Sequence, residues 1–209
     1  SLMTMSSDAL DTDGPLKILT ICSHNRTRSV MTMAMLQRNL DDRLGTGAVV
    51  VRSLGFGPED MPSIPDAVAA MARRGLDTSA HRSRQVTERN IDVPDLILTA
   101  ELDHVIKIAA ISPSAYRRSM TMPEFLELAA QREATAGIGL RGWTTELTAD
   151  RTARDYINAE VGEIFDPTGS SPRVFEKSVV EMEEMCALAA TLIAAVVDPL
   201  PAPNRFDFD

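Results

Sequence analysis

The 209-residue sequence is poor in aromatic side chains, holds only two cysteines and has no excess of basic charge. Aromatic residues make up 4% of the chain, and 30 acidic against 21 basic residues leave a net charge of −9. This balance argues against a general nucleic-acid-binding surface, because such surfaces neutralise phosphates with lysine and arginine. A local cationic pocket remains compatible with it. The apolar share of 44% is sufficient for one globular domain with a sizeable core.

The cysteines, Cys22 and Cys186, lie too far apart in the sequence to suggest a disulfide framework or a cysteine-rich zinc pattern. We therefore expect free thiols in a reducing cytoplasm, with neither a metal nor a cofactor. The chain has no apolar run long enough for a membrane span, and its polar, acidic beginning does not resemble a signal peptide. The sequence predicts a cytoplasmic protein and leaves its oligomeric state open.

Segments rich in β-branched residues alternate with segments of helical period. We expect strands over 16–21, 48–51, 96–99 and 119–122, and helices over 28–44, 65–74, 101–111, 123–134 and 173–197. Strands and helices that alternate through short connections predict βαβ units and a parallel sheet. We expect a single α/β domain over 15–198, a disordered tail over 1–14 whose first residues derive from expression, and a loose tail over 199–209. Region 135–165 has no clear pattern.

Cys22 stands where the first predicted strand meets the first predicted helix. Ligands of parallel α/β sheets bind beyond the carboxyl ends of strands, at helix N-termini that attract anions. The same field, together with neighbouring arginines, favours a thiolate. Arg28 could meet two oxygens of an oxyanion in a bidentate pair. Taken alone, Cys22 could equally be a small buried hydrophobic residue, but its position between strand and helix favours a chemical role.

The segment "ICSHNRTRS" resembles the signature of the low-molecular-weight protein tyrosine phosphatases, which is Cys, five residues, Arg, then Ser or Thr, after the first strand. Further stretches are similar to this family in the same order: "VVVRSLGFG", "RRGLDTSAHRSRQVT", "PDLILTAELDHV", "RRSMTMPEFLEL" and "IFDPTGSSPRVFEKSVVEMEEMCALAATLI". The resemblance implies a single doubly wound α/β domain. Its central four-stranded parallel sheet would have helices on both faces and a phosphate-binding loop after the first strand.

The resemblance also implies catalytic roles for three residues. Cys22 would be the nucleophile that forms a cysteinyl-phosphate. Arg28 would hold the phosphate oxygens as charge builds in the transition state. Asp166, within Asp-Pro, would protonate the leaving oxygen and then activate water. Without the resemblance, "DPTG" would be interpreted simply as a turn.

Further residues would bind the phosphate or support the loop. The phosphate-binding set implied by the resemblance is Ser23, His24, Asn25, Arg26, Thr27 and Arg28. Ser29 would hydrogen-bond the Cys22 sulfur. Asn25 would take a left-handed backbone conformation, supported by Ser53 and His81.

The loop departs from the family pattern at four positions. His24 replaces a usual glycine and would line the mouth of the pocket. Thr27 stands where relatives often have a second cysteine, so a protective disulfide with the nucleophile is not expected. Ser23 and Arg26 replace apolar wall residues, and Arg26 would favour an acidic or doubly anionic substrate.

Aromatic candidates for the substrate wall are scarce. Phe56 is the only one in the loop after the second strand. Region 135–165, which contains Trp143 and Tyr156, could cover the pocket, or it could be a longer surface connection. Cys186 lies on the apolar stripe of the last predicted helix and is interpreted as a core residue.

The expected activity is hydrolysis of phosphate monoesters, with a phosphotyrosine protein or a small aryl phosphate as substrate. One alternative is an arsenate reductase on the same scaffold. A route through several cysteines is disfavoured, because Cys186 is the only other cysteine, whereas a route through a small thiol stays open. A second alternative is a non-catalytic phosphate- or phosphoprotein-binding module, suggested by His24 in place of glycine.

Overall fold

The computed structural model describes residues 14–135 and 137–198. Within these ranges, the strands β1 (Leu16–Ile21), β2 (Val49–Leu54), β3 (Leu96–Thr99) and β4 (Ser119–Thr121) form one parallel sheet. Its order is β2-β1-β3-β4, so the chain starts near the middle of the sheet and builds outward in both directions. The predicted four-stranded parallel sheet is confirmed.

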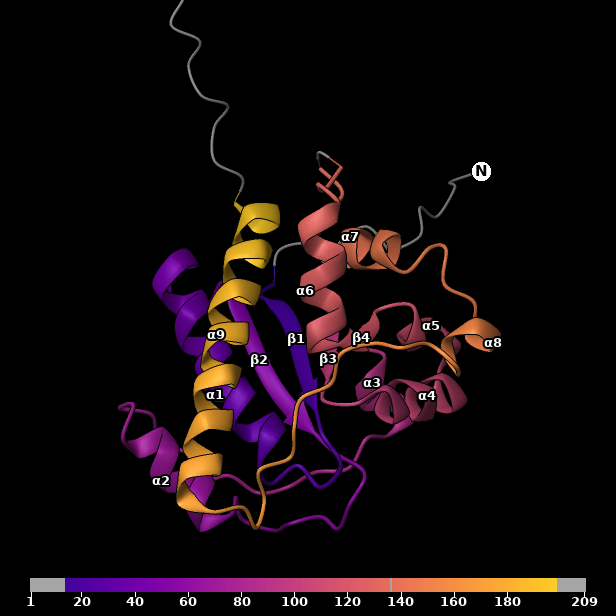
Figure 1. Cartoon of the computed structure of the whole chain (residues 1–209). Coiled ribbons are helices and arrows are strands. Elements are labelled where there is room, and N and C mark those ends of the chain that lie inside the picture. Colours follow the sequence, from indigo (N-terminus) through magenta and orange to yellow (C-terminus); the bar gives the residue numbers. More distant parts are fainter. Residues whose placement is uncertain (1–13, 136, 199–209) are drawn as a thin grey trace, which may run out of the picture.

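Helices cover both faces of this sheet (Figure 1). The helices are α1 (Arg28–Leu44), α2 (Pro65–Ala72), α3 (Glu88–Ile91), α4 (Leu102–Ile111), α5 (Pro113–Tyr116), α6 (Met122–Gln131), α7 (Gly139–Leu147), α8 (Ala153–Tyr156) and α9 (Pro172–Val197). The larger apolar core joins one sheet face to α1, α2, α6, α7 and α9. A smaller core joins the other face to α3, α4 and α5. The doubly wound architecture is therefore confirmed.

Burial on both faces explains the composition of the central strands. In β3 all four residues, "LILT", are buried, and Leu98 faces the larger core whereas Ile97 faces the smaller one. A strand covered on both sides has no polar face, so it reads as a continuous apolar run. This is why the bounds of β1 and β3 agree with the predicted ones.

The second strand is longer than predicted. The sequence pattern predicts an end at Val51, but the strand pairs along the whole of β1, up to the pair between Ile21 and Leu54. The polar residues Arg52 and Ser53 mask this extension in the sequence. Arg52 is exposed, whereas Ser53 is buried next to the loop that follows β1. The extension brings Ser53 to the same edge of the sheet as Cys22.

Two of the three aromatic residues of region 135–165, Trp143 and Tyr156, do not cover the loop after β1. Trp143 in α7 is buried and packs edge-on against Phe125, with ring centroids 5.8 Å apart. Tyr156 in α8 is buried against Tyr116 and donates a hydrogen bond to Glu124 Oε1 at 2.7 Å. Another part of the region does reach the candidate site, because Ile164 O accepts from Arg28 Nη1, so the hypothesis that region 135–165 covers the pocket stays a hypothesis. The alternative of a surface connection is incomplete, because both rings anchor short helices to the domain.

Other sequence-based interpretations have mixed outcomes. Cys186 is fully buried in the larger core, as expected. The tails expected over 1–14 and 199–209 lie outside the described residues except for Gly14. Among the residues that are described, no helix is long and apolar enough to cross a membrane.

Candidate active site

The loop of residues 22–28 connects β1 to α1 at the carboxyl edge of the sheet. Its carbonyl groups point to neighbouring segments: Ser23 O accepts from Phe56 N at 2.8 Å, and Arg26 O accepts from Ile64 N at 3.1 Å. The backbone N–H groups of residues 23–28, in contrast, find no acceptor in the part of the chain that the structure describes. Backbone donors in folded proteins are nearly always paired. Unpaired donors at a helix N-terminus are therefore available for an anion from outside the chain.

Asn25 produces the curl of this loop. Its φ of 54° is left-handed, a conformation that asparagine tolerates better than most residues. The side-chain Nδ2 donates to Ser53 Oγ and to Ser29 Oγ, each at 2.9 Å, and Oδ1 accepts from Arg84 N at 3.0 Å. This fully buried amide thus connects the loop to β2, to α1 and to the segment after α2.

His81 supports the same residue from outside the loop. Its Nε2 lies 2.8 Å from Asn25 O, and a carbonyl can only accept, so Nε2 carries the proton and donates. Partial burial lowers the pKa of His81 below its ordinary value, which favours the neutral ring. The contacts of Ser53 and His81 with Asn25 are those that the family resemblance implies.

The sulfur of Cys22 lies within the curl. Cys22 is 3% exposed, and its Sγ is 3.0 Å from Ser29 Oγ. Ser29 Oγ already accepts from Asn25 Nδ2, so its own proton is free to point at the sulfur. A thiolate can only accept hydrogen bonds, and this hydroxyl is placed to donate one.

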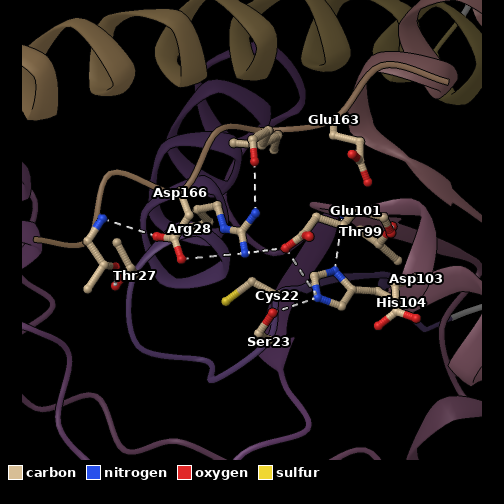
Figure 2. Close-up of polar contacts among 12 residues, drawn as sticks. Cys22, Ser23, Thr27, Arg28, Thr99, Glu101, Asp103, His104, Glu163 and Asp166 are labelled. Atoms are coloured by element: carbon tan, nitrogen blue, oxygen red, sulfur yellow. Dashed lines mark hydrogen bonds and ion pairs between the residues drawn. The ribbon is translucent and has the colours of Figure 1, made fainter. Parts of the chain in front are cut away.

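Arg28 is the first residue of α1, and its guanidinium is buried beside the loop. Nη1 donates to Ile164 O at 2.8 Å, and Nη2 donates to Glu101 Oε2 at 2.6 Å. Asp166 Oδ2 lies 3.8 Å from the same Nη2. Figure 2 shows Cys22, Arg28 and Asp166 grouped together, although Asp166 comes from a segment more than 130 residues further along the chain.

Asp166 sits in a turn that is attached to the loop. Its Oδ1 accepts from Thr168 N at 3.1 Å, and Thr168 Oγ1 lies 3.0 Å from Thr27 Oγ1. Side chains of this kind stabilise an Asx turn. Because the Asp166 side chain is half-exposed, the carboxylate can meet a ligand that enters from solvent.

Sequence reasoning missed Glu101 as a site residue. It follows β3, which pairs directly with β1, and it begins α4 as the N-cap. The pair of Ile21 with Thr99 brings the ends of the two strands together, so Glu101 reaches Arg28. The available signal was an acidic residue directly after a buried parallel strand, at the edge where ligands bind.

His104 was also missed, and it reaches the loop from α4. Its Nδ1 accepts from the N–H of Glu101 at 3.1 Å, so Nε2 carries the proton and donates to Ser23 Oγ at 2.9 Å. Burial is the main cause that lowers the pKa of His104 to about 4. The ring is therefore neutral near pH 7 and has a defined tautomer.

Three residues lie at the mouth or margin of the site. His24 is exposed, and its ring lies close to Gly57. Arg26 is partly buried and donates from Nε to Pro62 O at 2.8 Å. Phe56 stacks on His104 with centroids 5.8 Å apart, so one of its faces supports α4. A second aromatic candidate, which the sequence interpretation did not consider, is the exposed Phe165 next to Asp166.

A family model described as "Low molecular weight phosphotyrosine protein phosphatase" matches residues 17–136, more than half of the chain. The chain belongs to this family. The match contains the whole loop of residues 22–28, whereas Asp166 lies beyond it. Among curated relatives, "Probable low molecular weight protein-tyrosine-phosphatase EpsP" of Ralstonia nicotianae is 38% identical over 85 residues, which cover 40% of this chain and 54% of that relative. The chain thus spans about half the length of this family member.

Two solved structures show the same fold. The YwlE arginine phosphatase from Geobacillus stearothermophilus superposes with a TM-score of 0.62 at 24% identity, over 85% of this chain and 92% of that one. The tyrosine phosphatase Wzb from Escherichia coli K30, in complex with sulphate, gives a TM-score of 0.60 at 22% identity, over 84% and 96%. At these identities the likeness establishes the low-molecular-weight phosphatase fold alone.

Proposed function

We propose that this chain hydrolyses phosphate monoesters, with phosphotyrosine in proteins as the substrate, through a cysteinyl-phosphate intermediate. The observation that carries the proposal is the set of unpaired backbone N–H groups at residues 23–28, curled beside the Cys22 sulfur. A phosphate group offers several acceptor oxygens and negative charge, which such donors stabilise at a helix N-terminus. The buried guanidinium of Arg28 adds a fixed positive charge at the same place.

In the first step the Cys22 thiolate attacks phosphorus, so a phosphorus–sulfur bond forms as the bond to the leaving oxygen breaks. Asp166, protonated at this stage, gives its proton to that oxygen, and an alcohol or phenol departs. Arg28 and the loop amides hold the equatorial oxygens while charge spreads over them. Ser29 donates to the sulfur before attack.

In the second step water attacks the same phosphorus and the phosphorus–sulfur bond breaks. The Asp166 carboxylate takes one proton from the water, and inorganic phosphate leaves. The sulfur departs as a thiolate, which the Ser29 hydroxyl again stabilises. The enzyme returns to its starting state without a metal or a redox cofactor taking part in this scheme.

The test compares wild type, Cys22→Ser and Asp166→Asn with para-nitrophenyl phosphate. Cys22→Ser removes the nucleophile and is expected to abolish turnover. Asp166→Asn removes the proton donor and is expected to lower kcat by about 100-fold or more, within the usual range for a general acid. Equal rates for all three proteins would refute the assignment and would favour a non-catalytic phosphate-binding module.

Asp150→Asn is the matched control for the aspartate. Its side chain is 96% exposed, and its only ion pair among the described residues is a long one with Arg132, at 3.9 Å. Turnover of this variant should equal that of wild type.

An acid-quench experiment with radiolabelled substrate tests for the covalent intermediate. Radiolabelled phosphate should be trapped on wild type and should not be trapped on Cys22→Ser.

Phosphoarginine is a second candidate substrate, because carboxylates surround the site. Figure 2 shows Glu101 and Asp166 beside Arg28, with Glu163 on the far side of Glu101. Glu101 is paired with Arg28 and Glu163 accepts from Leu102 N, whereas Asp166 is half-exposed. The positively charged guanidinium of a phosphoarginine side chain would meet the negative charge of the Asp166 carboxylate there. Rates on matched phosphotyrosine and phosphoarginine peptides decide between the two substrates.

Arsenate reduction through a cysteine relay receives no support from the position of Cys186. This thiol is fully buried in α9, where it lies 3.6 Å from Thr32 O, and burial raises its pKa. A thiol held in this way is a poor partner for Cys22. Arsenate-dependent oxidation of an added small thiol, with negligible phosphatase turnover, would favour the remaining arsenate route.

We also propose that the protein works in a reducing compartment such as the cytoplasm, because Cys22 must stay a free thiol.

A further inference from the structure

A cleft of about 680 Å³ lies over the β1–β2 part of the sheet. Its apolar lining includes Leu19, Val50, Leu54, Val93 and Pro94. This volume falls within the range of small-molecule sites, which are about 300 to 1,000 Å³. The loop of residues 22–28 does not contribute to the lining, so the cleft is separate from the candidate active site.

The sheet geometry explains why this cleft is both apolar and cationic. Side chains alternate between the two faces of a strand, so Lys17 and Leu19 of β1 share one face. Lys17 pairs with Val50 and Leu19 pairs with Arg52, so the face continues on β2. Apolar and basic side chains therefore line one surface. On this side of the sheet, α3, α4 and α5 pack on the smaller core and leave the cleft between the strands and segment 81–94.

Three of the four lysine and arginine side chains that line the cleft lack an opposite charge among the described residues, whereas the fourth, Arg82, lies 3.9 Å from Asp60 Oδ1. Within the described ranges, the side chains of Lys17, Arg52 and Arg84 form no ion pair within 4.0 Å, although all three line the cleft. No described carboxylate is part of the lining. Asp95 lies nearby, but its carboxylate accepts from Lys17 N and pairs with Arg141. In a chain with a net charge of −9, unopposed basic groups around an apolar floor are complementary to an anion with an apolar body.

The walls of the cleft include two residues that hold the active-site loop. Ser53 accepts from Asn25 Nδ2, and His81 donates to Asn25 O. Both residues also line the cleft. An anion bound here would face His81 and so stabilise the protonated ring, which burial otherwise disfavours. A change in the position or charge of His81 would alter its hydrogen bond to the carbonyl oxygen of Asn25, the residue that curls the loop.

We propose that this cleft is a second, regulatory anion site that binds a small organic anion with an aromatic or aliphatic body. The negative group lies against Arg52, Lys17 and Arg84, and the body lies on the apolar floor. Occupancy alters the affinity of the loop for phosphate through His81 and Ser53. The regulatory part of this proposal rests on the proposed function, whereas the binding part does not.

The probe is 1-anilinonaphthalene-8-sulfonate, an aryl sulfonate that becomes fluorescent in apolar sites. It is titrated into the full chain with saturating inorganic phosphate, so that the loop of residues 22–28 is occupied. Arg52→Glu should weaken saturable binding by about tenfold or more, since one reversed charge readily contributes about 1.4 kcal/mol. Lys17→Gln, which only removes a charge, should weaken it less.

Arg43→Glu is the matched control. Arg43 lies exposed in the last turn of α1, outside the cleft lining, and its reversal makes the same change in net charge. The affinity of the Arg43→Glu variant for the probe should stay within about twofold of the wild-type affinity. Binding that is equal in wild type, Arg52→Glu and Arg43→Glu would overturn the proposal. Circular dichroism of each variant verifies folding, and the neutral double variant Lys17→Gln, Arg52→Gln replaces any variant that does not fold.

Another occupant is conceivable, because the acidic residues Asp8, Asp11 and Asp13 precede Pro15, which lines the cleft. Changing these three aspartates to asparagine in the full chain tests this alternative. If the probe binds only after that change, the natural occupant is the chain's own N-terminal segment, and the proposal of a small organic anion fails.

Calorimetric titration with inorganic phosphate tests the regulatory part. A saturating amount of the probe should change the dissociation constant of phosphate by about fivefold, and Arg52→Glu should remove this effect. An unchanged constant would overturn regulation and leave the site as a binding site. None of these measurements depends on turnover, so their failure is distinguishable from failure of the proposed hydrolysis.

Discussion

Glu101 Oε2 lies 2.6 Å from Nη2 of Arg28. The two residues stand at the N-termini of helices on opposite faces of the sheet, at the same sheet edge, since Arg28 is the first residue of α1 and Glu101 is the N-cap of α4. With Ile164 O as a second acceptor, the guanidinium is held by bonds to both of its terminal nitrogens. Its orientation is therefore set before a substrate enters. Preorganised charge of this kind stabilises a transition state without reorganisation during the reaction.

We expect Glu101→Gln to lower kcat on para-nitrophenyl phosphate by about 10- to 100-fold, the usual effect of a small misplacement of a catalytic group. Glu101 acts through Arg28 as a positioning residue, so kcat should fall more than KM changes. Steady-state kinetics measure both constants. Glu101→Asp, which keeps the charge, should recover part of the loss.

Glu160→Gln is the control for this substitution, because Glu160 is exposed and forms no hydrogen bond or ion pair within the described residues. Its kinetic constants should match those of wild type. If Glu101→Gln raised KM alone and left kcat intact, the carboxylate would serve ground-state binding, and the positioning role would be wrong.

Ser29→Ala should slow the second step more than the first. The hydroxyl lies 3.0 Å from the Cys22 sulfur, and in the proposed second step the sulfur leaves as a thiolate when water attacks. A hydrogen bond to a charged group contributes about 1.5 to 3 kcal/mol, which corresponds to a loss of about 10- to 100-fold in rate. Rapid-quench experiments should show a larger burst and more trapped phosphoenzyme than wild type. A smaller burst would mean that Ser29 serves mainly the attack by Cys22.

The end of β1 and the start of α1, on either side of the Cys22 loop, agree with the bounds that the sequence predicts, and there is a physical reason for this. β1 and β3 are buried on both faces, so their apolar runs begin and end sharply, and α1 has a broad apolar face over its full length. The signature around Cys22 and Arg28 is likewise local. Features that depend on neighbouring residues in the chain are therefore predictable from the sequence.

Features that depend on the sheet order are not predictable in this way. Glu101 and His104 reach the loop only because β3 lies beside β1. The four-residue helices α3 and α5 are too short for a periodic pattern. The burial of Trp143 could not be predicted either, because its aromatic partner, Phe125, lies on another helix. Tertiary contacts decide these cases. For Glu101 the local pattern indicates an acidic residue after a buried strand, but it does not indicate that the carboxylate meets Arg28.

The neutral state of His104 predicts a loss of stability in acid. Burial lowers its pKa in the folded protein to about 4, whereas the unfolded chain has the ordinary value near 6.5. Between these values the unfolded chain binds a proton at His104 that the folded chain does not. The contribution of His104 to the free energy of unfolding is therefore fully present above pH 6.5 and is lost as the pH falls towards 4. The difference corresponds to about 3 kcal/mol. Urea unfolding across this range measures it.

His104→Asn should flatten this dependence. A smaller slope should remain, because burial also lowers the pKa of His81. His24→Asn is the exposed control, and its unfolding free energies should follow those of wild type at every pH. If wild type and His104→Asn lost stability in parallel between pH 6.5 and 4, the buried neutral ring would not be the cause.

A substitution at Gly55 is the most direct test of how closely β2 and the segment after it pack against the loop of residues 22–28. A Cβ at this position would lie 2.7 Å from Asn25 N and 2.8 Å from Asn25 Cβ, and both of those atoms belong to the curl. Gly55 itself cannot retreat, because its N–H donates to Arg84 O and its carbonyl accepts from Val86 N. In Gly55→Ala, Asn25 therefore has to move, and the amides of residues 23–28 move with it.

We expect Gly55→Ala to lower kcat/KM on para-nitrophenyl phosphate by about 100-fold, since a displacement near 1 Å is sufficient for such a loss. Gly57→Ala is a graded comparison, because its Cβ would meet chiefly the exposed ring of His24, which can rotate away. Gly14→Ala is the control, because none of the described atoms lies within 4 Å of the added carbon. We expect activity to be highest in Gly14→Ala, lower in Gly57→Ala and lowest in Gly55→Ala. Wild-type activity in Gly55→Ala would show that the curl at Asn25 adapts to the added carbon without losing its function.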